Sequence, residues 1–180
     1  MAGRGRTAVR RARWWTIPVL LAAAWLYWTD GHLLPPREIR TDNGERVEVI
    51  DGDSLRIAGR VIRLQGYDAP EYRQDCAEPD GRAWPCGRAA RDRLVALAGA
   101  GGLVCADHGR DRYGRTIARC RNPDGDIGAA MVREGLGRRL RNARDTRYAA
   151  EEAEARRAGR GLWRGTHHHP ADWRDARRGG

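Results

Sequence analysis

The chain has 180 residues, which leaves room for one domain with a hydrophobic core and short extensions. Its formal net charge is +10, and Arg supplies all of the Lys-plus-Arg total of 34 because the chain contains no Lys. Arg suits phosphate recognition since its guanidinium group can bind two oxygens at once, but a GC-rich coding bias also explains abundant Arg, Ala and Gly. The composition is therefore compatible with a nucleic-acid partner without establishing one.

The first 28 residues have the layout of an export signal. Five Arg and no acidic residue occupy residues 1–13, and an apolar run follows from Trp14 to Trp28. Cleavage in the Ala22–Ala24 stretch would leave a Trp- and Tyr-rich segment exposed, so an uncleaved membrane anchor is favoured over a cleaved signal peptide. We therefore expect export, with the domain held on the extracytoplasmic side of the inner membrane, or secreted or periplasmic if the signal is cleaved.

Beyond this segment the chain divides into three predicted parts. Residues 29–43 are polar and contain two consecutive Pro, which predicts a linker. Residues 44–165 are expected to form the folded domain, and residues 166–180 an Arg- and His-rich tail. The three His at 167–169 are compatible with a transition-metal site, but a disordered polar tail is the favoured interpretation.

The first part of the predicted domain has the pattern of strands. Polar and apolar residues alternate over 46–50, 54–57 and 61–68, and the tight turns DGD and AGR join these segments. Two further strand-like segments cover 103–107 and 116–121. The first three segments predict a meander, and the last two predict a further pair of strands.

Helical patterns account for much of the remainder. Apolar residues share one helical face in the segments 87–98, 127–136 and 144–158, which end at glycines. The order of elements favours an α+β fold: a five-stranded, all-antiparallel OB-fold-type β-barrel with three helices, preceded by one hydrophobic anchor or signal helix. Barrels of this type commonly bind oligonucleotides.

The four cysteines agree with export, because an even number outside the cytoplasm favours disulfides. Cys76 and Cys86 flank one polar loop, and an antiparallel pair folded about residues 112–113 would bring Cys105 opposite Cys120. We predict the disulfides Cys76–Cys86 and Cys105–Cys120. A zinc site is the competing interpretation, but no C-x₂-C spacing supports it.

Four short motifs lie at strand ends or turns: DGDS at 51–54, IRL at 62–64, YDAPE at 67–71 and DRYGR at 111–115. Each is an ordinary turn or strand exit by itself. Together they supply three carboxylates and two guanidinium groups, and carboxylates that cluster repel one another unless a cation lies among them. Oxygen ligands suit a hard cation such as Ca²⁺, and two Arg beside it would stabilise the charge that develops on a phosphodiester. The members of this set are Asp53, Arg63, Asp68, Glu71 and Arg115.

In order and spacing these motifs resemble those of the thermonuclease (staphylococcal-nuclease-like) family, and the resemblance covers roughly residues 45–163. It implies a nuclease that cleaves the P–O5′ bond of DNA or RNA and leaves a 3′-phosphate. It also implies Ca²⁺ bound by the carboxylates of Asp53 and Asp68 and by the backbone carbonyl of Ala69. Glu71 would orient or deprotonate the attacking water, and Arg63 and Arg115 would bind the phosphate in the transition state.

The chain departs from the family pattern at the substrate-binding positions. Arg112 replaces a Lys of the family's best-known member, whereas Tyr113 is retained and is expected to contact the nucleotide. The nucleotide-stacking Tyr expected near residues 140–142 is missing, and Arg141 is the candidate replacement.

Two other functions compete with the nuclease. One is a catalytically inactive OB-fold module that binds nucleic acid while tethered to the membrane. It predicts the loss of at least one catalytic side chain, and none is lost. The other is a membrane-anchored structural protein with a basic face, which leaves the acid and Arg set without a purpose. The expected partners are DNA or RNA and the membrane, and no protein partner is implied.

Overall fold

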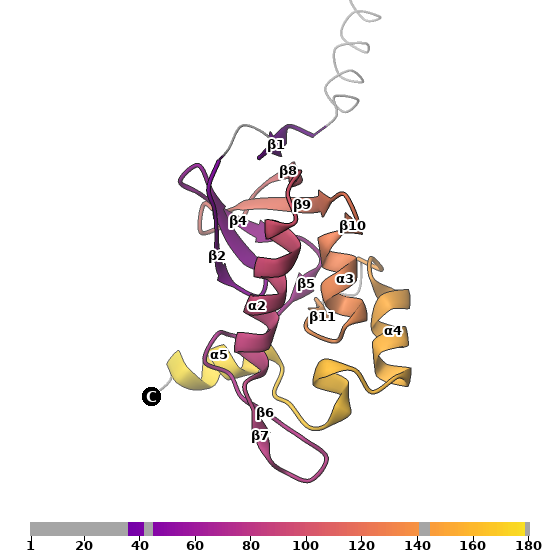
Figure 1. The fold of residues 1–180 in the computed structure, drawn as a ribbon. Helices are drawn as coiled ribbons and strands as arrows, with labels where there is room; N and C mark the ends of the chain where they lie inside the picture. Colours follow the sequence, from indigo (N-terminus) through magenta and orange to yellow (C-terminus); the bar gives the residue numbers. More distant parts are fainter. Residues whose placement is uncertain (1–35, 42–44, 141–144, 179–180) are drawn as a thin grey trace, which may run out of the picture. The chain divides into compact units, whose positions relative to one another are not determined.

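The computed structural model describes residues 36–41, 45–140 and 145–178 (Figure 1). Within these ranges the chain forms eleven short strands, four α-helices and one 3₁₀ helix. The predicted anchor, residues 1–28, lies outside the described ranges. Inside them, no helix is long and apolar enough to cross a membrane.

The predicted meander is present. β2 (Val47–Asp51), β3 (Ser54–Ile57) and β4 (Arg60–Leu64) pair antiparallel in sequence order. Alternation places Ile57 and Ile62, both fully buried, on the core side of the sheet. The sheet therefore forms where the sequence pattern predicted it.

The sheet is mixed rather than all-antiparallel, which corrects the predicted barrel. β8 (Val104–Arg110) and β9 (Thr116–Asn122) form an antiparallel hairpin, but β9 pairs with β4 in parallel. The seven-stranded sheet has the order β1-β8-β9-β4-β3-β2, with β10 (Gly125–Asp126) also paired to β9. The strands form a half-barrel that is consistent with an OB-like α+β fold. Alternation of side chains indicates which face is buried and carries no information on strand direction.

One strand lies within the predicted linker. β1 (Glu38–Arg40) pairs antiparallel with the edge of β8, and Ile39 lies opposite Cys105. A three-residue segment has too short an alternation to be identified as a strand from its sequence. The ordered domain therefore begins before residue 44.

The three predicted helices are present as α2 (Cys86–Gly99), α3 (Ile127–Arg133) and α4 (Ala149–Arg157). In Figure 1, α2 runs along the sheet, and α3 and α4 lie side by side next to it. Asp126 caps α3 by accepting a hydrogen bond from the backbone N–H of Ala129 at 3.0 Å. The helices close the core over the sheet with the buried side chains Ala90, Leu94, Leu97, Ile127 and Met131.

A fourth helix, α5 (Pro170–Arg178), occupies the segment that was predicted to be a disordered tail. It follows the 3₁₀ helix η1 (Gly161–Arg164) and lies near the N-terminal end of α2 (Figure 1). The backbone N–H of Ala77 donates to the carbonyl of Thr166 at 2.8 Å, and the Gln74 side chain donates to the carbonyl of His168 at 2.9 Å. These bonds fix the segment that leads into α5 against the domain.

Both predicted disulfides are confirmed. Cys105 and Cys120 face each other directly across β8 and β9. The second bridge joins Cys76 in β6 (Cys76–Ala77) to Cys86 at the start of α2. β6 pairs with β7 (Ala83–Trp84), and this small sheet packs on Leu162.

Candidate active site

The turn between β2 and β3 presents the first carboxylate. The backbone N–H of Asp53 donates to the Asp51 side chain at 3.1 Å, which holds the turn. A side chain on Gly52 would place its Cβ 2.7 Å from the Cβ atoms of both Ala69 and Ala90, so only Gly allows this approach. The turn therefore brings Asp53 against the segment that follows Asp68.

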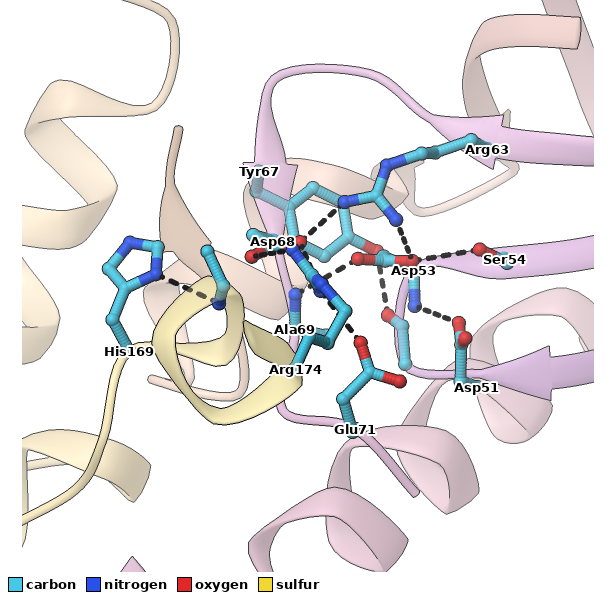
Figure 2. A network of polar contacts seen from close by, with 12 residues as sticks. Asp51, Asp53, Ser54, Arg63, Tyr67, Asp68, Ala69, Glu71, His169 and Arg174 are labelled. Carbon is cyan, nitrogen blue, oxygen red and sulfur yellow. Dashed lines mark hydrogen bonds and ion pairs between the residues drawn. The ribbon is translucent and has the colours of Figure 1, made fainter. Parts of the chain in front are cut away.

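The two aspartates share one guanidinium group. Arg63 on β4 donates to Asp53 Oδ1 at 2.9 Å through Nη1 and to Asp68 Oδ1 through Nη2 (Figure 2). Asp68 lies in β5 (Tyr67–Asp68), which pairs with β11 (Arg138–Arg139). Both aspartates are 2 % exposed, so the pair is removed from water and needs its positive partner.

Asp53 accepts two further hydrogen bonds. The Ser54 hydroxyl donates to Oδ1 at 2.8 Å, and the backbone N–H of Ala69 donates to Oδ2 at 3.1 Å. Burial nevertheless raises the pKa of Asp53 to about 8, against the opposing effect of Arg63. Burial also opposes ionisation of Asp68, but Arg174 and Arg63 together hold its pKa below the ordinary value of 3.8.

Glu71 follows β5 on a loop that leads toward α2. Its backbone N–H donates to the Gln74 side chain at 3.2 Å, and its carbonyl accepts from the Gln74 N–H at 2.7 Å. A Cβ on Gly87 would lie 1.7 Å from this carbonyl, so α2 packs directly against the loop. The Glu71 carboxylate remains 26 % exposed and accepts from Arg174 at 2.7 Å.

The β8–β9 hairpin supplies the second predicted arginine. Arg115 donates from Nε to Asp111 Oδ2 at 2.7 Å, and its backbone N–H donates to Asp111 Oδ1 at 2.9 Å. Tyr113 at the tip is 61 % exposed, and its ring lies 5.6 Å from the Arg115 guanidinium carbon. Arg112 donates to the Tyr113 hydroxyl at 2.7 Å.

These elements enclose one cleft of about 590 Å³. The predicted catalytic side chains Arg63, Glu71 and Arg115 line it, and so do the predicted substrate-binding residues Arg112 and Tyr113. The cleft is polar and carries both signs of charge, which suits an anionic substrate that must be bound beside a base. Its other lining residues are Asp51, Ala171, Arg174 and Asp175.

The donor set of the site fits a hard divalent cation. Carboxylate and backbone carbonyl oxygens are the ligands that Ca²⁺ prefers, and Asp53, Asp68 and Ala69 supply them within one hydrogen-bonded cluster. In the described part of the chain, however, no three acidic, His or Cys side chains converge as a preformed cage. The carboxylate oxygens are instead engaged by N–H and O–H donors.

Comparison with known proteins agrees with this geometry. Residues 61–165 match the family described as "SNase: Staphylococcal nuclease homologue". The chain belongs to this family. Its predicted identification as a thermonuclease-like protein is thereby confirmed.

Three relatives of this SNase-family chain are similar to it over about two thirds of its length. The "Succinoglycan biosynthesis protein ExoI" of Rhizobium meliloti (strain 1021) is 33% identical over 126 residues, which cover 69% of this chain and 66% of that relative. Two proteins named "Uncharacterized endonuclease", from Escherichia coli O157:H7 and Escherichia coli, are each 32% identical over 127 residues, or 67% of this chain and 76% of theirs. The family and the endonuclease-named relatives support nuclease activity.

Arg174 is a residue of this SNase-family site that the sequence motifs did not predict. Five of the nine residues of the α5 helix that carries it are Asp or Arg, so its segment was interpreted as a tail. Two signals were present: Pro170 occupies the first helical position, and Asp172 lies in the first turn. The predicted substrate-binding residue Arg141 lies outside the described residues.

The His run belongs to the folded part of this SNase-family chain. His167 Nε2 lies 3.1 Å from an Arg138 nitrogen, and His169 Nδ1 accepts from the Ala171 N–H at 3.2 Å, at the start of α5. These contacts make the run part of the connection between η1 and α5 rather than a free tail.

Proposed function

We propose that this chain is a calcium-dependent nuclease that hydrolyses phosphodiester bonds in DNA and/or RNA outside the cytoplasm. It cleaves the P–O5′ bond and leaves a 3′-phosphate. The observation that carries the proposal is the cleft that Arg63, Glu71 and Arg115 line together, with the Asp53 and Asp68 carboxylates paired to Arg63.

Each side chain has a role that follows from its position. Arg63 and Arg115 reach the cleft from β4 and from the β8–β9 hairpin, so both can donate to the equatorial oxygens of one phosphate. Glu71 is a partly exposed carboxylate of the cleft that lies outside the buried aspartate pair, and it accepts the proton of the attacking water. When bound at Asp53, Asp68 and the Ala69 carbonyl, Ca²⁺ would supply positive charge to the phosphate and to that water.

In the proposed hydrolysis, every bond and proton is accounted for by water, the phosphodiester, Glu71 and solvent. The oxygen of water forms a bond to phosphorus while the bond from phosphorus to O5′ breaks. Glu71 takes one proton from the water, and the leaving 5′ oxygen takes a proton from solvent. Tyr113 and Arg112 lie at the rim of the cleft, where they contact the nucleotide next to the scissile phosphate.

Action outside the cytoplasm rests on the sequence of residues 1–28, and the two disulfides support it because such bonds persist in oxidising compartments. A fusion of alkaline phosphatase after residue 45 should be active outside the membrane. Activity only from a cytoplasmic reporter at the same position would reverse this proposal.

The purified full-length chain tests the activity. It should degrade single-stranded DNA or RNA with Ca²⁺, and chelation by EDTA should stop the reaction. Glu71→Gln should remove activity, whereas Glu48→Gln, at an exposed site on β2, should leave it unchanged. Hydrolysis that persists in EDTA, or in the double variant Glu71→Gln with Arg115→Ala, would contradict the mechanism. Calcium-independent binding without cleavage would favour the inactive nucleic-acid-binding module.

A further inference from the structure

Arg174 reaches from α5 into the centre of the site. Its Nη1 donates to Glu71 Oε1 at 2.7 Å and to Asp68 Oδ1 at 3.2 Å, and its Nη2 donates to Asp68 Oδ2 at 3.0 Å (Figure 2). One side chain thus bridges the carboxylate that would hold a cation and the carboxylate that would accept a proton. α5 follows every motif that identifies the family and lies beyond the matched residues 61–165.

These bonds leave little of the Asp68 carboxylate for another cation. A carboxylate has about four lone-pair positions, and three N–H groups engage Asp68, one from Arg63 and two from Arg174. Calcium ligands lie at about 2.3–2.6 Å from the ion, so a guanidinium group and the ion cannot share the same oxygen face. Only the release of Arg174 opens that face, because Arg63 is held between two buried aspartates.

The charge of the site favours replacement of the Arg174 guanidinium group by a divalent cation. The carboxylates of Asp53, Asp68 and Glu71 face the guanidinium groups of Arg63 and Arg174, so the ionised cluster carries a formal charge of −1. Replacement of Arg174 by a divalent cation makes the same cluster neutral. Arg174 therefore neutralises the fully ionised cluster only in part, and a divalent ion completes the neutralisation.

The backbone contacts that fix the segment before α5 to the domain end at His168. This segment is fixed at Thr166 and His168. Arg177 in the last turn of α5 stacks on Trp173 of the same helix, with its guanidinium carbon 4.4 Å from the ring centre. Rotation beyond His168, which would also expose the buried Pro170, would withdraw Arg174 from the cleft while the aspartates stay in place.

We propose that α5 is an autoinhibitory plug whose Arg174 competes with calcium for Asp68 and blocks Glu71 until the ion displaces it. This inference rests on the proposed calcium-dependent nuclease function. The fraction of molecules with α5 withdrawn sets the apparent calcium affinity, because only they offer the open Asp68 face. Release of Arg174 also frees the Glu71 carboxylate, so cation binding and activation of the base occur together.

Calcium binding by the full-length chain tests the plug directly, with isothermal titration calorimetry as the readout. Arg174→Ala should lower the Kd for Ca²⁺ by about tenfold. Arg177→Ala removes the same charge from the same helix without touching the cleft and should leave the Kd unchanged. An unchanged or higher Kd for Arg174→Ala would overturn the inference, because it would make Arg174 a support of the site.

A second measurement needs no variant. Hydrogen exchange of the α5 amides in the wild-type chain should be faster with Ca²⁺ than with EDTA, while exchange in β4 and β9 stays the same. Calcium binding without a change in α5 exchange would also overturn the plug.

Nuclease assays of the same preparations distinguish a failure of the autoinhibitory plug from a failure of the proposed calcium-dependent nuclease function. If Ca²⁺ supports hydrolysis and binds both chains equally, the plug is wrong and the function stands. If no chain binds Ca²⁺ and none hydrolyses nucleic acid, both fall together.

Discussion

The Tyr67 hydroxyl donates a hydrogen bond to the backbone carbonyl of Gly52 at 3.0 Å. Both residues are buried, and each directly precedes an aspartate of the site. The bond therefore fixes the turn that carries Asp53 against the short strand that carries Asp68. The ring of Tyr67 also packs against Gly137, where a Cβ would lie 2.5 Å away, so the phenol has little freedom to move.

Removal of this hydroxyl should weaken both stability and activity. Tyr67→Phe leaves the buried Gly52 carbonyl without its donor, which should lower the free energy of unfolding by about 1–3 kcal/mol. Activity should fall because the spacing of Asp53 and Asp68 loses its restraint. Urea denaturation and an assay on an oligonucleotide measure the two effects. Tyr72→Phe, at a site 47 % exposed, is the control and should change neither. Wild-type stability in Tyr67→Phe would contradict the role of the bond.

The pKa of Asp53 predicts a pH effect on stability in EDTA. The unfolded chain ionises Asp53 near its ordinary value of 3.8, whereas burial raises the folded pKa to about 8. The stabilisation from the protonated form is thus complete below the unfolded pKa and is lost as the pH rises through the folded pKa. The thermal midpoint of the wild type should fall relative to Asp53→Asn between about pH 5 and about pH 8. Calcium should reduce the pH dependence of the difference in thermal midpoint between the wild type and Asp53→Asn, because a bound cation favours the ionised Asp53 carboxylate.

The comparison with Asp53→Asn isolates this one group. His167 has a lowered pKa and titrates in the same range with the opposite effect on stability, but it contributes equally to both proteins. Asp68, whose pKa lies below 3.8, is already ionised there. A difference between the two midpoints that does not change with pH would rule out the raised pKa.

Catalysis should require the paired N–H donors of the two cleft guanidinium groups, Arg63 and Arg115, and not only their positive charge. Arg63→Lys and Arg115→Lys keep the charge but lose paired donation to phosphate, and each should lower kcat by about 10²–10³. Arg63→Lys should also lower the thermal midpoint, since Arg63 neutralises two buried aspartates. Arg60→Lys, on the exposed end of β4, provides the control. Full activity of either cleft variant would remove that arginine from the mechanism.

The two disulfides should differ in their effect on activity. Their loops span 10 and 15 residues, so replacing either pair with Ser should cost about 2–4 kcal/mol in urea denaturation. Loss of Cys76–Cys86 should also lower kcat, because Cys86 begins α2 next to the Glu71 loop. Loss of Cys105–Cys120 should leave kcat near wild type below the unfolding transition. Equal effects on kcat would contradict this difference.

Much of the fold could be predicted because its signals are local. Alternation identified β2, β3 and β4, and one apolar face identified α2. The distances of Cys105 and Cys120 from one turn identified their pairing. The four motifs together placed Arg63, Glu71 and Arg115 in one cleft.

What could not be predicted depends on long-range contacts. The parallel pairing of β4 with β9 leaves no mark on the alternation of either strand. β1 is a strand only because the edge of β8 is available to it. Five of the nine residues of α5 are Asp or Arg, and the ion pairs of Arg174 that join it to the site connect residues more than 100 positions apart in the sequence.

The parallel pairing also determines when the site can exist. Arg63 lies beside Ile117, two residues beyond Arg115, and the helix α2 and the β8 strand separate the two arginines along the chain. A nascent chain that ends with β8 lacks Arg115, one of the two arginines that line the cleft, even if its first strands have already folded. The two cleft arginines therefore come together only after β9 has been placed beside β4.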